Sequence, residues 1–354
     1  MVASWTRIAA AMIAALALVY GNAGAGDAPC GPYGDQPAEI QTGFFAGLVT
    51  KHTPDCFRGK LLGPWRDSDG TDHYSCVYEP SSIEDGNPLP LVVFLHGSLA
   101  DADLVILTNL SASLETADLG GGHKGFILLS PEGRDTTHYY IGPDRTGLGW
   151  DNWYRQFNPS GDTTVSGVKY RENVDAAAID YFIEQEVATG RVDRKRIYMT
   201  GWSNGAAMAL TYALNRPMIA AAAIYSAPDP FGAFGDPCRQ TPVTHPAANN
   251  GEIQLTNSHV PVMHVRNSCD IGGICPNGNT LSRQLRSIGI EFDDVIIDAS
   301  SNRVETCDDS CGTDPDAGIN IFSIGSIRGL KNHIVWPNDW TARMLEFLRN
   351  HPSQ

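Results

Sequence analysis

The chain has 354 residues, of which 42% are hydrophobic and 18% are charged, and its formal net charge is −15 at pH 7. This length and hydrophobic content suit one large domain or two smaller ones with a sizeable core. The negative charge argues against a nucleic-acid partner, because the phosphate backbone would be repelled.

Residues 1–25 have the pattern of an export signal. Arg7 supplies the positive end, residues 8–20 are apolar, and residues 23–25 have the small-residue form that a signal peptidase cuts after. The alternative is a membrane anchor, but the apolar run is shorter than the roughly 20 residues that span a bilayer. We expect a secreted or periplasmic protein with no membrane anchor after signal cleavage.

Residues 26–73 form a predicted cysteine-containing N-terminal extension, and residues 74–354 form the predicted main domain. An even cysteine count in an exported chain predicts disulfide bonds, although the pairing stays open. The alternative is a metal site, but none of the spacings reproduces a zinc-type CxxC pair, so we expect no metal and no cofactor. The eight cysteines are Cys30, Cys56, Cys76, Cys238, Cys269, Cys275, Cys307 and Cys311.

Short, continuous apolar runs recur along the chain, as expected for strands that are covered on both faces of a sheet. These runs are residues 91–97, 125–131, 196–201, 220–227, 260–265 and 319–324. Residues 172–187 and 338–351 instead repeat apolar residues every three to four positions, which predicts helices. The alternation predicts an α/β fold, with a mostly parallel central sheet and helices on both faces.

Residues 135–170 and 228–259 are predicted to be long loops. The first is rich in aromatic residues, which favours a binding wall over a surface insertion of no consequence. These aromatic residues are Tyr139, Tyr140, Trp150, Trp153 and Tyr154.

The strand predicted at residues 196–201 runs directly into the sequence GWSNG and a run of alanines. A G-x-S-x-G turn between a strand and a helix projects a serine hydroxyl from the edge of a sheet. We therefore predict Ser203 as a nucleophile, with the backbone N–H of Asn204 as one donor to an oxyanion.

A nucleophilic serine of this kind needs an acid and a histidine, in the chain order Ser, acid, His. Asp270 follows a predicted strand, at a place where a loop can present a carboxylate. His333 is predicted to lie in the loop between the last apolar run and the terminal helix, and it is the predicted base. His264 lies inside a predicted strand and is interpreted as a core histidine. The carboxylates that compete with Asp270 are Asp294, Asp298 and Asp308.

The second oxyanion donor is expected from the turn after residues 91–97. Gly97 allows a close backbone approach, and the N–H of Ser98 or Leu99 can pair with that of Asn204. His96 is interpreted as a structural residue whose ring braces this turn.

With these residues assembled, the chain resembles the α/β-hydrolase superfamily and, within it, the secreted polyhydroxybutyrate depolymerase and feruloyl esterase group. The matching stretches are PLPLVVFLHG, VDRKRIYMTGWSNGAAMA, PVMHVRNSCD and GLKNHIVWP. Two departures stand out: Arg266-Asn267 replaces the family's His-Gly, and one extra residue separates His333 from Trp336-Pro337. The resemblance runs from about residue 74 to the end and implies an α/β-hydrolase catalytic domain with Ser203, Asp270 and His333 as its triad.

The predicted function is that of a secreted serine esterase or depolymerase acting on a polyester or a feruloyl ester. Two alternatives stay open: a β-diketone C–C hydrolase acting on oxidised polyvinyl alcohol, and a non-catalytic binding protein on a hydrolase scaffold. The residues predicted to bind substrate are Trp150, Trp153, Trp202 and Trp336.

Overall fold

The computed structural model describes residues 53–67, 72–98, 100–138, 145–150, 163–165, 168–170, 173–231, 255–271, 274–298, 303–304, 306–308, 311 and 327–353. The predicted signal, the run at 319–324, Cys30, Cys238, Leu99 and Trp153 lie outside these residues, so those predictions stay as they were.

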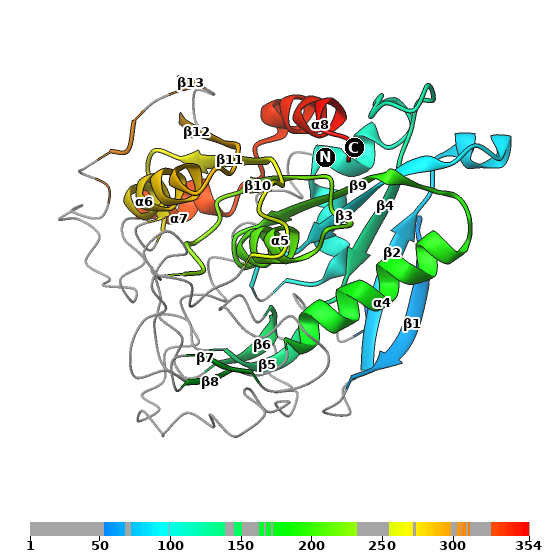
Figure 1. The fold of residues 1–354 in the computed structure, drawn as a ribbon, viewed down its shortest axis with the longest axis horizontal. Helices are drawn as coiled ribbons and strands as arrows, with labels where there is room; N and C mark the ends of the chain where they lie inside the picture. Colours follow the sequence, from blue (N-terminus) through cyan, green and yellow to red (C-terminus); the bar gives the residue numbers. More distant parts are fainter. Residues whose placement is uncertain are drawn as a thin grey trace.

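One sheet forms the centre of the described structure (Figure 1). Its strand order is β1-β2-β4-β3-β9-β10-β11-β12-β13. The strands from β4 through β3 to β12 run parallel, whereas β2 is antiparallel to both of its neighbours and β13 is antiparallel to β12. The strands are β1 (Lys60–Arg66), β2 (Asp72–Tyr78), β3 (Leu89–Leu95), β4 (Ile127–Pro131), β9 (Val192–Trp202), β10 (Ala221–Tyr225), β11 (Val262–Asn267), β12 (Phe292–Asp298) and β13 (Arg303–Val304).

Helices cover both faces of this sheet (Figure 1). Successive side chains of β3 point to opposite faces: Leu91 and Val93 share a core with α4, α5 and α6, whereas Val92 and Phe94 share one with η2 and α8. The helical segments are η1 (Ser81–Asp85), η2 (Ala102–Leu107), α3 (Asn109–Ser113), α4 (Val174–Ala188), α5 (Asn204–Asn215), α6 (Ile274–Ser287), α7 (Ile327–His333), η3 (Asn338–Trp340) and α8 (Thr341–Asn350). The predicted α/β architecture is confirmed.

Two differences from the sequence predictions concern strands without a continuous apolar run. Within residues 135–170, predicted to be a loop, β5 (Arg134–His138) pairs with β6 (Arg145–Gly149), and β7 (Thr163–Val165) pairs with β8 (Val168–Tyr170). The main sheet also begins earlier than residue 74, because β1 lies within the predicted extension.

All six cysteines within the described residues form disulfides, which confirms that prediction for this part of the chain. The pairs are Cys56–Cys76, Cys269–Cys311 and Cys275–Cys307. Among the described residues, no helix is long and apolar enough to cross a bilayer.

Candidate active site

Ser203 lies at a sharp turn between β9 and α5. Its φ of 58° and ψ of −121° are uncommon for a residue with a side chain. A Cβ added at Gly205 would overlap the carbonyl oxygens of Leu95 and His96, and one at Gly201 would overlap the Gly205 carbonyl. Both flanking positions must therefore be glycine, and the turn lifts the serine side chain out of the strand direction.

The three residues predicted as a triad form one hydrogen-bonded line. The Ser203 Oγ lies 2.7 Å from His333 Nε2, and His333 Nδ1 lies 2.7 Å from Asp270 Oδ1. Asp270 follows β11, as expected. His333 was predicted in a loop, but it is the last residue of α7, a seven-residue helix too short to show a clear apolar period. Their catalytic roles remain a proposal.

The buried Asp270 carboxylate accepts hydrogen bonds on both oxygens. Oδ1 also accepts from the Ile271 N–H (2.8 Å), and Oδ2 accepts from the Ser226 hydroxyl (2.6 Å) and the Asn267 amide (3.2 Å). Burial by itself raises the pKa of Asp270, but the charge and hydrogen bond of His333, together with the hydrogen bonds from Ser226 and Ile271, outweigh it and hold the pKa below its usual value. The carboxylate is therefore ionised at neutral pH.

The turn after β3 runs beside Ser203. A Cβ added at Gly97 would lie 3.4 Å from the Trp202 carbonyl oxygen and 3.5 Å from Ser203 Cβ. Asn204 is the first residue of α5, so its backbone N–H has no acceptor within the helix. Its side-chain amide is engaged elsewhere, accepting from the Trp150 N–H (2.7 Å) and donating to the Trp150 carbonyl (3.0 Å). The oxyanion site at the Ser98 and Asn204 N–H groups stays a prediction.

His96 braces this turn, in agreement with the sequence interpretation. Its Nε2 accepts from the Gly133 N–H (2.8 Å), so the ring hydrogen is on Nδ1, which donates to the Gly97 carbonyl (2.8 Å). The ring is fully buried, and burial lowers the pKa of His96 to about 4. His96 is thus a neutral structural residue.

The described tryptophans that were predicted to bind substrate are buried. Trp150 donates to the His96 carbonyl (2.9 Å), Trp202 to the His333 carbonyl (2.8 Å), and Trp336 to the Thr341 hydroxyl (2.9 Å). All three indole N–H groups therefore have partners within the protein, and Trp202 also holds the backbone of the predicted base. Contact with substrate stays a prediction for these residues.

His264 lies within β11 and its side chain is buried in the protein core, as its position in a predicted strand suggested. Its Nε2 accepts from the Ala227 N–H (3.1 Å), and burial lowers the pKa of His264 to about 4. Two of the three competing carboxylates form ion pairs: Asp294 pairs with Arg266 (2.7 Å) and Asp308 pairs with Arg328 (2.7 Å).

The two buried histidines predict a loss of stability in mild acid. Histidine in an unfolded chain has a pKa of about 6.5, whereas His96 and His264, with pKa values of about 4, stay neutral down to that pH. Within this window the unfolded chain binds more protons than the folded one, so the free energy of unfolding falls as the pH falls. Urea unfolding measured at several pH values checks this.

The matched variant is His264→Gln, whose amide oxygen can still accept from the Ala227 N–H. We expect a shallower pH dependence of the unfolding free energy, because one of the two buried imidazoles is gone. If the unfolding free energy of His264→Gln changed with pH as steeply as that of the wild type, His264 would not be a buried histidine that stays neutral in the folded state.

The order of the strands and the serine turn together identify the fold. The antiparallel strand β2 lies between β1 and β4, β3 and β4 exchange places relative to the chain order, and the strand-turn-helix that carries Ser203 follows the central strand β9. The chain has the α/β-hydrolase fold. In an α/β-hydrolase, this turn carries the nucleophile, and the acid and histidine follow it in the chain.

No protein-family model and no curated protein matches the chain. Among solved structures, it is similar to a thermostable esterase, with a TM-score of 0.48 and 15% identity over 84% of this chain and 64% of that one. It is also similar to esterase 2 of Thermogutta terrifontis, with a TM-score of 0.46 and 13% identity over 72% and 85% of the two chains. A ferulic acid esterase matches with a TM-score of 0.43 and 15% identity over 71% and 92%.

The chain thus spans less than two thirds of the thermostable esterase. Within the described residues, no group of three or more His, Cys, Asp or Glu side chains is placed to hold a metal ion.

Proposed function

We propose that this chain is a secreted serine hydrolase that cleaves carboxylic esters through an acyl-enzyme. The observation that carries the proposal is the continuous hydrogen-bonded line from the Ser203 hydroxyl through His333 to Asp270, with both distances at 2.7 Å. This arrangement matches the roles of nucleophile, base and orienting acid.

In the proposed acylation step, Ser203 Oγ attacks the ester carbonyl carbon while His333 Nε2 takes the hydroxyl proton. Asp270 accepts from His333 Nδ1–H, which keeps Nε2 free to accept that proton. The carbonyl oxygen becomes an oxyanion, for which the backbone N–H groups of Ser98 and Asn204 are the proposed donors.

The tetrahedral intermediate then collapses, and His333 gives its proton to the departing alcohol. Water enters, loses a proton to His333 and attacks the acyl carbon, and the second collapse returns the proton to Ser203 and releases the carboxylic acid. No step requires a cofactor.

The proposed substrates are polyester-type or feruloyl esters, and the proposed location is outside the cytoplasm. The net charge of −15 suits neutral or weakly charged substrates better than polyanions. Three disulfides within the described residues support an oxidising compartment.

A product assay tests both the bond cleaved and the substrate class. Purified protein is incubated with methyl ferulate, short hydroxybutyrate oligomers and a β-diketone, and the products are identified by mass. We expect free ferulic acid or hydroxybutyrate units, and no product after treatment with a fluorophosphonate. Cleavage of the diketone alone would overturn the ester assignment.

A further inference from the structure

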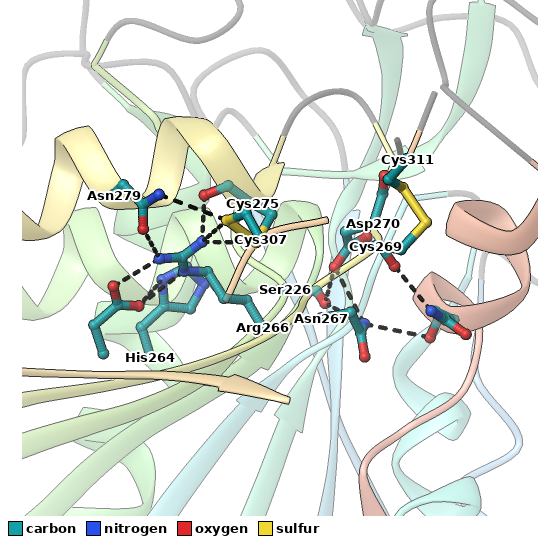
Figure 2. The surroundings of a disulfide bond; sticks show 12 residues. Ser226, His264, Arg266, Asn267, Cys269, Asp270, Cys275, Asn279, Cys307 and Cys311 are labelled. Carbon is teal, nitrogen blue, oxygen red and sulfur yellow. Dashed lines mark hydrogen bonds and ion pairs between the residues drawn. A yellow bond between two sulfur atoms is a disulfide. The ribbon is translucent and has the colours of Figure 1, made fainter. Parts of the chain in front are cut away.

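The oxygen of Asp270 that faces away from His333 is surrounded by donors that the proposed mechanism does not use. Oδ2 accepts from the Ser226 hydroxyl at 2.6 Å and from the Asn267 amide at 3.2 Å (Figure 2). A buried carboxylate without such donors would lose its hydrogen bonds to water and gain none in their place, which is unfavourable. These two side chains therefore favour the ionised form and restrict rotation of the carboxylate.

Ser226 occupies a backbone conformation that suits glycine better. It directly follows β10, its φ is 49°, it is fully buried, and its N–H donates to the Val265 carbonyl (2.8 Å). A non-glycine residue in this region is strained, and such strain concentrates at functional sites. Glycine would relieve the strain but would lose the hydroxyl that Asp270 accepts from.

Asn267 connects the stretch that carries the acid with the stretch that carries the base. Its amide nitrogen lies 2.8 Å from the Tyr225 hydroxyl, and that hydroxyl in turn lies 2.9 Å from the Val335 carbonyl oxygen. From the other side, the Asn332 amide donates to the Cys269 carbonyl at 2.9 Å. The neighbours of Asp270 and of His333 are thus interlocked.

The orientation of the Asn267 amide is dictated by its surroundings. Turning it over would place its oxygen against the Asp270 carboxylate, which is unfavourable because both are acceptors. In the observed orientation its Oδ1 is buried without a hydrogen-bond partner among the described residues. A buried polar atom without a partner lowers the stability of the fold. The hydrogen bonds that the same amide donates to Asp270 and Tyr225 offset this cost.

We propose that Ser226 and Asn267 are positioning residues that hold the Asp270 carboxylate in line with His333. The proposal rests on the proposed function, in which Asp270 orients the base. They act through Asp270 and touch no substrate atom, so their loss slows turnover rather than weakening substrate binding.

Two variants of Ser226 separate positioning from a structural role. Ser226→Ala and Ser226→Gly both remove the hydroxyl, but only glycine also relieves the backbone strain. We expect kcat to fall about 10- to 100-fold in both, the effect of losing a hydrogen bond to a charged group, with KM within about twofold. The thermal midpoint of Ser226→Gly should be at or above that of Ser226→Ala.

Asn267→Leu, which removes the amide at similar volume, should also lower kcat with little change in KM. Ser268→Ala is the matched control, because the Ser268 hydroxyl is buried two residues from Asp270 but has no partner among the described residues. It should keep wild-type kcat.

Wild-type kcat in the folded Ser226 variants would overturn the positioning role, as would an equal loss in Ser268→Ala. Ser203→Ala is measured in parallel. If it is inactive while the Ser226 variants have wild-type kcat, only the positioning role fails. If it remains active, the proposed function fails, and the positioning role fails with it.

Discussion

Ser203→Ala should lower kcat for a p-nitrophenyl ester by about a million-fold, since loss of a triad nucleophile removes the covalent route altogether. The fold should survive the change. Alanine keeps the Cβ, and the backbone N–H of residue 203 still donates to the Tyr225 carbonyl, a bond of 3.0 Å that does not involve the side chain. The measurements are kcat and the thermal midpoint of the same preparation.

A fluorophosphonate gives an independent check on this result. It should label the wild-type protein once, at Ser203, and should fail to label Ser203→Ala. Ser268→Ala is again the control and should be labelled like the wild type. Near-native turnover in Ser203→Ala would show that the nucleophile lies elsewhere, and inertness of the wild type toward the reagent would favour the non-catalytic binding protein.

The strands that could be predicted from the sequence are those whose burial requires a run of consecutive apolar residues. β3, β4, β10, β11 and the second half of β9, residues 197–202, are buried on both faces, so their apolar residues form runs along the chain. By contrast, β1 has mostly exposed side chains and pairs on only one edge, and the β5–β6 ribbon pairs through its backbone. Neither an exposed edge strand nor a ribbon held by backbone hydrogen bonds needs a run of apolar residues, so neither can be recognised from one.

The same distinction applies to the candidate site. Ser203 sits in a local motif, and the chain order then restricted the acid and the histidine to a few residues, among which the strand ends favoured Asp270 and His333. Ser226 has no such signal, because its partner Asp270 is 44 residues away in the sequence. At position 267 the sequence shows only an asparagine in place of the family's glycine, and the proposed positioning role would account for that departure.

Asp270→Asn should lower kcat about 10⁴-fold at neutral pH, although the side chain keeps its shape. Both Asp270 oxygens accept hydrogen bonds, so an amide must turn its NH₂ toward a donor wherever it points. Toward His333, the NH₂ would force the ring hydrogen onto Nε2, which then cannot accept the proton of Ser203. Toward Ser226 and Asn267, it would meet their donors instead. Steady-state kinetics on the folded variant measure the loss.

The lowered pKa of Asp270 also predicts that the folded state loses stability in acid. Because its folded pKa lies below the unfolded value of about 3.9, ionisation of Asp270 stabilises the fold above that pH, and this contribution is lost as the pH falls through the folded pKa. Asp270→Asn lacks the group, so its unfolding free energy should fall less over that acidic range. For the loss of kcat, Asp308→Asn is the control, since Asp308 forms a partly exposed pair with Arg328 and the substitution should change kcat little. A larger kcat loss in Asp308→Asn than in Asp270→Asn would transfer the role of the acid to that residue.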